Sequence, residues 1–165
     1  MKNKSIIIIS LVALLGAGCV PAVPPLPGSP TTEQPRVSTA KDFEINLSGQ
    51  GLAKVPEDIL RRADVTSLNL SDNALEGSLP AEIRHMTSLR VLNVSGNLMT
   101  GVPAEIGQLQ NLRTLDLSDN MLTGLPYELG NLQNLELLDI SGNEYSEADL
   151  ERIEAELPAT TVIRR

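Results

Sequence analysis

The sequence predicts an α/β solenoid, in which repeated units stack into one parallel sheet with short helical or 3₁₀ segments on its opposite side. Five units begin at residues 42, 65, 89, 112 and 135, so successive starts lie 23, 24, 23 and 23 residues apart. A fixed period in this range is the signature of a repeat architecture. The chain also has one Phe, two Tyr and no Trp, so its core must be aliphatic, as in stacked layers of leucine.

The first part of each unit predicts a short strand. In the unit that begins at residue 112, Leu115 and Leu117 alternate with polar residues, and a period of two places them on one face of a strand. Strands of successive units would pair in parallel, about 4.8 Å apart.

An asparagine follows the strand in four of the five units, at a corner where backbone groups would otherwise lack partners. An amide side chain both donates and accepts hydrogen bonds, so we expect this column to be structural. The first unit has Gln50 at this place. The members of the column are Asn73, Asn97, Asn120 and Asn143.

The second part of the first four units predicts a short helical segment. Each segment begins with proline, which loses no hydrogen bond at the first helical position, and has a carboxylate two residues later beside the positive end of the helix dipole. These acids are therefore interpreted as helix-stabilising and not as catalytic. The segments begin at 56–59, 80–83, 103–106 and 126–129.

The last unit breaks off after its asparagine, and residues 144–165 predict a C-terminal cap on the repeats of 41–143. Ser146 and Asp149 have the spacing of a capping box, and apolar residues at 150, 153 and 157 share one helical face. Pro158 ends this helix, and residues 160–163 predict a last edge strand. Such a cap would cover the last leucine layer.

The pattern L-x-x-L-x-L-x-x-N, followed by G-x-P, resembles the leucine-rich repeat family over about two thirds of the chain. The resemblance implies a concave sheet that docks a protein partner. Arg90 and Arg113 could then bind carboxylates of the partner. Alternatively, the polar columns are only a soluble covering, and Arg113 pairs with Glu136. The candidate binding residues are Phe43, Asn69, Arg90, Val91, Asn93, Arg113, Asp116 and Asp139.

Residues 1–18 have the pattern of a signal peptide, with Lys2 and Lys4 before an apolar run at 6–15 and small residues before Cys19. The run is too short for a membrane span. Its cysteine makes it similar to a bacterial lipoprotein signal, although Gly16 stands where that pattern usually has Leu. This resemblance implies cleavage before Cys19 and acylation of that residue. The alternative is an ordinary secreted protein whose cysteine is incidental.

The segment 19–40 predicts a disordered, extended tether, because six prolines lie among Ser, Thr and Gly. Acyl chains on Cys19 would anchor the protein in a membrane of the cell envelope, facing the periplasm or the exterior. By resemblance to Gram-negative lipoproteins, Val20 in place of Asp after the cysteine favours the outer membrane.

Charge and residue chemistry exclude several functions. The formal net charge is −8, and becomes −10 without Lys2 and Lys4. This acidic field disfavours nucleic-acid binding. Cys19 is the only cysteine and His85 the only histidine, so neither an activated nucleophile nor a metal or cofactor site is expected. Two carboxylates on adjacent strands, Asp116 and Asp139, do not make an oxygen shell for a metal. The sequence therefore favours a non-enzymatic protein-binding module, with a structural envelope lipoprotein as the alternative.

Overall fold

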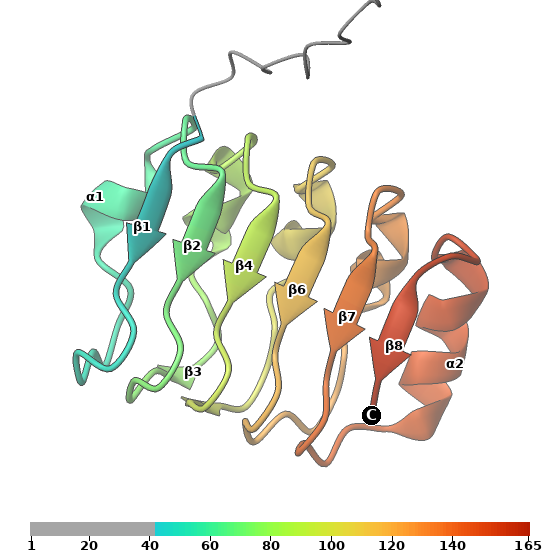
Figure 1. Cartoon of the computed structure of the whole chain (residues 1–165). Helices are drawn as coiled ribbons and strands as arrows, with labels where there is room; N and C mark the ends of the chain where they lie inside the picture. The colour runs from blue at the N-terminus through green and yellow to red at the C-terminus, as the bar shows by residue number, and fades with distance from the viewer. Residues whose placement is uncertain (1–41) are drawn as a thin grey trace, which may run out of the picture. The chain divides into compact units, whose positions relative to one another are not determined.

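The computed structural model describes residues 42–165. The predicted signal peptide, the predicted lipidation site Cys19 and the predicted tether of 19–40 lie outside the described residues. The described part is the predicted solenoid, with one strand of a six-stranded parallel sheet in each of the five units and a sixth strand at the C-terminus (Figure 1). The strands, in their order across the sheet, are β1 (Glu44–Asn46), β2 (Ser67–Asn69), β4 (Val91–Asn93), β6 (Thr114–Asp116), β7 (Leu137–Asp139) and β8 (Val162–Arg164).

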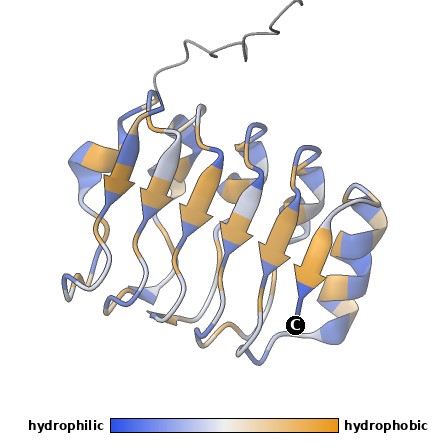
Figure 2. Cartoon of the chain, viewed as in Figure 1, coloured by the Kyte–Doolittle hydropathy of each residue, from blue (hydrophilic) through white to orange (hydrophobic). Residues whose placement is uncertain are grey.

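The register of the sheet aligns the same position of every unit. The central residue of each strand is apolar and points into the core, and these residues pair in one line across the sheet (Figure 2). The line runs through Ile45, Leu68, Leu92, Leu115, Leu138 and Ile163. Strand β8 confirms the edge strand that the C-terminal residues predict.

Four short helical segments lie behind the sheet: α1 (Glu57–Leu60), η1 (Ala81–His85), η2 (Ala104–Gln108) and η3 (Tyr127–Asn131) (Figure 1). The last three are 3₁₀ helices, so the alternative left open by the sequence is resolved toward the tighter form. Each proline lies one position earlier than predicted, at the N-cap with an extended backbone. There its carbonyl accepts the first helical hydrogen bond, as Pro103 does from the amide of Ile106.

A second, two-stranded parallel sheet, which the sequence did not predict, lies between the corner asparagine and the helical segment of the second and third units. It pairs β3 (Glu76–Gly77) with β5 (Leu98–Met99). The amides of Leu98 and Thr100 donate to the carbonyls of Leu75 and Gly77, at 2.9 and 2.8 Å.

The C-terminal helix α2 (Glu147–Glu156) covers the last layer of the core with Leu150 and Ile153, which are fully buried. The predicted capping box is wrong in its detail. The side chain of Ser146 makes no capping hydrogen bond, and its carbonyl instead accepts the amides of Asp149 and Leu150. Among the described residues, no helix combines the length and the apolar character needed to cross a bilayer.

The core is one continuous stack of aliphatic side chains between the sheet and the helical segments. Leucines of the middle units, such as Leu92 and Leu115, have no exposed surface. Part of the first layer is only partly buried, and this part contains the chain's one phenylalanine. Its members are Phe43, Ile45, Leu47 and Leu52, whereas Val55, Ile59 and Leu60 of the same unit are buried.

Candidate functional site

The asparagine column supports the corner of each unit and is therefore part of the scaffold. The Oδ1 atom of Asn97 accepts the amide of Leu75 at 3.0 Å, and its Nδ2 atom donates to the carbonyls of Leu70 and Val94, at 3.1 and 2.9 Å. One amide thus satisfies backbone groups of its own unit and of the unit before it. The same arrangement recurs at Asn73, Asn120 and Asn143.

The surface available for binding is the outward side of the sheet, which we call the sheet face. Two rows of side chains form it, one on either side of the buried central line. The first residue of each strand forms one row, which we call the middle row; it contains Glu44, Ser67, Val91, Thr114, Leu137 and Val162. The end row contains Asn46, Asn69, Asn93, Asp116, Asp139 and Arg164.

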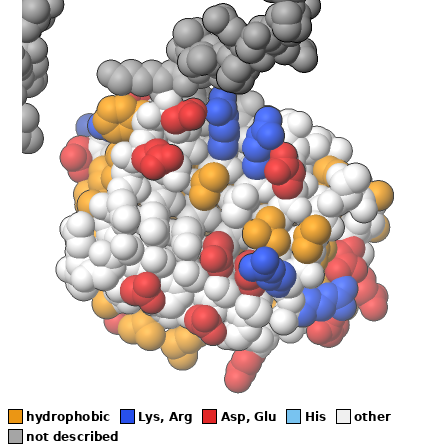
Figure 3. Space-filling view, in the orientation of Figure 1, with side chains coloured by type: hydrophobic (Ala, Val, Ile, Leu, Met, Phe, Trp, Pro, Cys, Tyr) orange, Lys and Arg blue, Asp and Glu red, His pale blue; other side chains and the backbone are white. Residues whose placement is uncertain are grey.

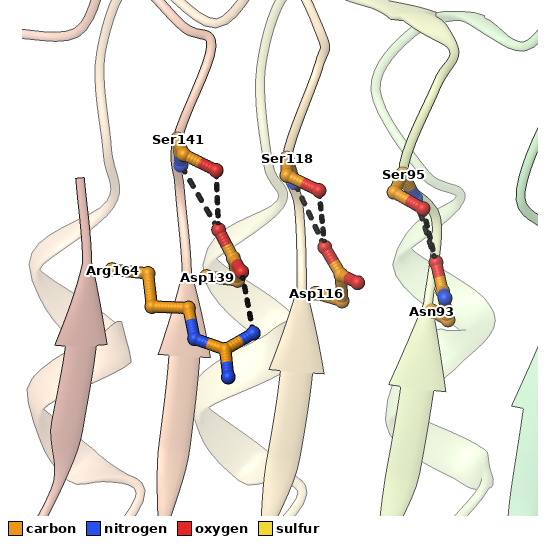
Figure 4. Close-up of polar contacts among 7 residues, drawn as sticks. All are labelled: Asn93, Ser95, Asp116, Ser118, Asp139, Ser141 and Arg164. Carbon is orange, nitrogen blue, oxygen red and sulfur yellow. Dashed lines mark hydrogen bonds and ion pairs between the residues drawn. The ribbon is translucent and has the colours of Figure 1, made fainter.

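Most of the end row is bonded within the protein, at the points where the strands end. The Oδ1 atom of Asn93 accepts both the amide and the hydroxyl of Ser95, at 2.9 and 2.7 Å. Asp116 binds Ser118 in the same way, with a hydroxyl distance of 2.6 Å (Figure 4). Such Asx turns fix the chain as it leaves a strand.

Three other members of the end row follow this pattern. Asn46 accepts the amide and the hydroxyl of Ser48, at 3.0 and 2.8 Å. Asn69 accepts only the amide of Ser71, at 2.9 Å. Asp139 accepts both groups of Ser141, with a hydroxyl distance of 2.6 Å (Figure 4). The Asn, Asp and Ser columns are therefore strand-end caps, and four predicted binding residues have this structural role.

Asp139 has one partner more than Asp116, the other acid of its row. Its second oxygen lies 3.3 Å from Nη1 of Arg164 on β8, so a side chain of the last strand neutralises it (Figure 4). The carboxyl group is mostly buried, which acts to raise its pKa. Hydrogen bonds from Ser141 and Arg164 outweigh this effect and hold the pKa of Asp139 below its usual value.

We expect the substitution Asp139→Asn to cost about 1 kcal/mol of unfolding free energy at neutral pH. The amide still accepts Ser141, as Asn93 does with Ser95, but loses the charge that attracts Arg164. Because the pKa of Asp139 is lower in the folded state, its carboxylate stabilises the protein at pH values above the ordinary carboxyl pKa. This contribution is lost as the pH falls through the pKa of the folded state. Urea unfolding of both proteins from neutral to acidic pH should therefore show the difference shrinking. A difference that stays constant with pH would contradict this assignment.

The predicted arginine anchors are already paired on the surface. Arg90 lies 3.2 Å from the carboxylate of Asp42, and Arg113 lies 3.0 Å from that of Glu136 on the next unit. Both arginines retain exposed surface, because their side chains are 43% and 59% exposed. Exposed pairs of this kind contribute little to stability and exchange easily for a partner's carboxylate.

Phe43 was predicted to lie on the sheet face, but it does not. It lies two residues before Ile45 and four before Leu47, so the three side chains share one face of the chain, and the ring of Phe43 packs against the partly buried first layer of the core. The guanidinium carbon of Arg62 lies 3.9 Å from the centroid of the ring. The single phenylalanine therefore closes the N-terminal end of the described solenoid and is not a free aromatic anchor.

The middle row becomes apolar toward the C-terminus, and Val91 is the one predicted binding residue in it. Val91, Thr114, Leu137 and Val162 are aligned on four adjacent strands. Val91 is 36% exposed and Val162 is 57% exposed. Hydrophobic side chains are visible over β4, β7 and β8, with charged side chains around them (Figure 3). The sequence does not predict Val162 as part of this row, because β8 follows a helix and its register is not fixed by the repeat.

A further polar ladder, which was not predicted from the sequence, lies where the helical segments return toward the sheet. Gln110 donates to the carbonyls of Gly107 and Asn131, at 2.8 and 3.2 Å. Asn134 donates to the carbonyl of Gln110 in the unit before it, at 2.8 Å. The repeated sequence Gln-Asn-Leu at 110–112 and 133–135 was the available signal. Within the described residues, no group of three or more His, Cys, Asp or Glu side chains is placed to hold a metal ion.

Family comparisons identify the repeats. A model described as leucine-rich repeats in two copies matches residues 110–152, and a single leucine-rich repeat model matches residues 64–86. The search of curated proteins gives no match.

Solved structures of leucine-rich repeat proteins share the fold. A leucine-rich repeat protein of Leptospira interrogans is 37% identical, with a TM-score of 0.63 over 68% of this chain and 28% of that one. The BIR3–SERK2 complex of Arabidopsis thaliana contains a chain that is 31% identical, with a TM-score of 0.54 over 67% of this chain and 66% of that one.

A third similar structure is the ectodomain of the Arabidopsis thaliana receptor kinase GASSHO1/SCHENGEN3, in complex with Casparian strip integrity factor 2. It is 34% identical, with a TM-score of 0.52 over 56% of this chain and 11% of that one. The present chain thus spans less than a third of the Leptospira protein and a small part of this receptor.

Proposed function

Because the chain carries leucine-rich repeats and folds as their solenoid, we propose that it is a non-enzymatic docking module whose sheet face binds a protein partner. The observation that carries this proposal is the apolar middle row, in which Val91, Leu137 and Val162 are presented on a rigid sheet. An apolar centre with a charged rim is the usual composition of a protein interface. Two of the similar structures are complexes, one of BIR3 with SERK2 and the other with Casparian strip integrity factor 2, which supports this use of the fold.

The charged rim suits a polar partner that also carries apolar side chains. Arg113 and Glu136 flank Leu137 on one side, and Asp139 and Arg164 flank it on the other. Both pairs are one arginine with one carboxylate, so the rim is balanced and a partner's charges would exchange with them. When ion-pair partners are exchanged in this way, the charges determine the orientation and specificity of binding more than its affinity.

The structural envelope lipoprotein remains the second candidate, and the end row favours it. Asn93, Asp116 and Asp139 direct their Oδ1 atoms to serines of their own units, so much of the polar sheet face is self-satisfied. A surface that serves only as a soluble covering would have the same caps. The exposed apolar row distinguishes the two candidates, because a covering has no need of it.

Catalysis is not part of the proposal. His85, the chain's only histidine, is exposed at the end of η1, behind the sheet. A serine or cysteine nucleophile would need such a base within hydrogen-bond reach. The proposed membrane anchor on Cys19 rests on the pattern of the leader, in which a positive start and a short apolar run precede small residues and the cysteine.

The test is a crosslinking capture from the native envelope, followed by direct binding of the captured protein in purified form. We expect the double variant Leu137→Asp with Val162→Asp to lose the partner, because two carboxylates would be buried in an apolar contact. A matched control, Ala104→Asp with Ala155→Asp, adds the same charge at exposed positions behind the sheet and should retain it. Equal capture by both variants would exclude the sheet face, and no partner for the wild type would favour the structural candidate.

The variant Cys19→Ser should in parallel lose labelled palmitate and membrane association.

A further inference from the structure

A groove of about 370 Å³ opens behind the sheet between the first two units, away from the sheet face. Its walls are formed by α1, β3 and η1, which contribute Leu60, Glu76 and Glu82. Leu75, Leu79 and Met99 line it as apolar core residues that are at most 5% exposed. The volume lies within the range of sites that hold small ligands or short peptide segments.

An additional residue in the second unit accounts for the position of the groove. The interval from the corner asparagine to the proline is seven residues from Asn73 to Pro80, but six from Asn97 to Pro103. The extra residue is Ser78, which is exposed and lines the groove. Elsewhere the helical segments pack closely, and a Cβ atom on Gly107 would lie 2.2 Å from the carbonyl oxygen of Glu128. The longer second unit therefore interrupts a stack that is otherwise tight.

One wall of the groove is an open strand edge. The carbonyls of Leu75 and Gly77 accept amides of the third unit, so β3 directs these groups toward β5. Backbone groups alternate along a strand, so the N–H and C=O of Glu76 face the other side, toward the first unit. The first unit is bonded there only as far as Leu52, whose carbonyl accepts the amide of Ala74, and Lys54 lies outside any strand. An unpaired edge of this kind can accept another extended chain.

The charges on the rim favour a basic ligand. Arg61 is paired with Glu57 at 3.5 Å, whereas no ion pair within residues 42–165 involves Glu76 or Glu82. Lys54 is the remaining cation of the lining, so the unpaired carboxylates exceed it by one. The net charge of −8 adds a general attraction for cations.

We propose that this groove binds a short extended peptide segment that carries aliphatic side chains between basic ones. The segment adds to β3 as a parallel or antiparallel strand, and its main chain bonds with the N–H and C=O of Glu76. Its aliphatic side chain fills the space over Leu79 and Met99, and a neighbouring basic side chain pairs with Glu76 or Glu82. Main-chain bonds provide affinity in strand addition, and the pocket for alternate side chains provides specificity. This site is separate from the sheet face and does not depend on the function proposed for it.

The test uses the full-length protein and a fluorescein-labelled hexapeptide in which leucine and lysine alternate, with fluorescence anisotropy as the readout. We expect saturable binding that weakens at least about tenfold in the variant Ser78→Trp, because the indole fills the groove from an exposed position. We expect a smaller loss, about threefold to tenfold, for Glu76→Lys, which reverses the rim charge. Circular dichroism establishes that each variant is folded.

Matched controls separate the groove from general effects of size and charge. Thr123→Trp and Glu144→Lys place the same side chains at exposed positions of later units and should bind as the wild type does. The double variant Leu137→Asp with Val162→Asp should also bind normally, so failure of the sheet-face proposal leaves this one intact. A hexapeptide N-methylated at alternate residues should not bind, because it cannot pair with a strand. The proposal is overturned if the wild type shows no saturable binding, or if Ser78→Trp or the methylated peptide binds as tightly as its reference.

Discussion

Replacing Asn120 by alanine should lower the unfolding free energy by about 3–5 kcal/mol, because several buried backbone groups would lose their partners together. The Nδ2 atom of Asn120 donates to the carbonyls of Val94, Leu117 and Ser118, at 3.0, 3.1 and 3.0 Å. Its Oδ1 atom accepts the amide of Met99 at 3.1 Å. A loss of this size is a large fraction of the 5–15 kcal/mol that is typical of a domain, so partial unfolding at 37 °C is expected.

The matched control for Asn120 is Asn111→Ala, which removes an exposed asparagine of the repeats that does not belong to the corner column. The Nδ2 atom of Asn111 makes one hydrogen bond, to the carbonyl of Thr87 at 2.8 Å, and water can replace it. We expect a cost below about 1 kcal/mol. Urea unfolding followed by circular dichroism measures both variants. Similar costs for the two would show that the corner column has no special role.

Replacing Gly107 by alanine should cost about 2–4 kcal/mol, although alanine is normally the better residue in a helical segment. A Cβ atom at this position would lie 2.2 Å from the carbonyl oxygen of Glu128 and 2.8 Å from its Cβ atom. The methyl group would thus force η2 away from η3, and the leucine layer between these units would open. Thermal unfolding should show a lower midpoint without a change in secondary structure at low temperature.

The comparison for Gly107 is Gly101→Ala, on the loop of the same unit. No atom lies within 4 Å of a Cβ built on Gly101, and its backbone is outside the left-handed region. We expect its effect to stay within about 0.5 kcal/mol of zero. If Gly107→Ala is equally neutral, the close approach of the two helical segments is not a constraint on stability.

The scaffold could be predicted from the sequence because each of its devices repeats. The leucine alternation predicts the strands and their buried line, and donor and acceptor needs at the corner predict the hydrogen bonds that Asn97 makes. The 3₁₀ form of three helical segments and the position of Pro103 at the N-cap were not predictable. Segments of one turn have no periodicity that distinguishes the two helical forms.

The sheet face was less predictable, because a polar residue on a strand can bind a partner or its own chain. The spacing of two residues between Asp116 and Ser118, and between Asp139 and Ser141, is the local signal of an Asx turn and could have identified the caps. The apolar row depended on the register of β8, which follows a helix and not a repeat. The groove depended on the single residue by which the second unit exceeds the others. The interval of 24 residues was visible, but its effect on packing was not.

The unequal packing of the units has a consequence for cooperativity. In a linear array, each unit communicates only with its neighbours, so cooperativity is limited by the weakest junction. Gly107 holds η2 against η3, and Gly130 brings η3 against α2, where a Cβ atom would lie 2.7 Å from that of Glu156. The groove leaves the first unit joined to the second mainly through the sheet and the corner asparagine, Asn73, with little contact between α1 and η1. The solenoid is thus a cooperative block of later units with one loosely coupled unit at its start, and a ligand in the groove would extend that cooperativity to the first unit.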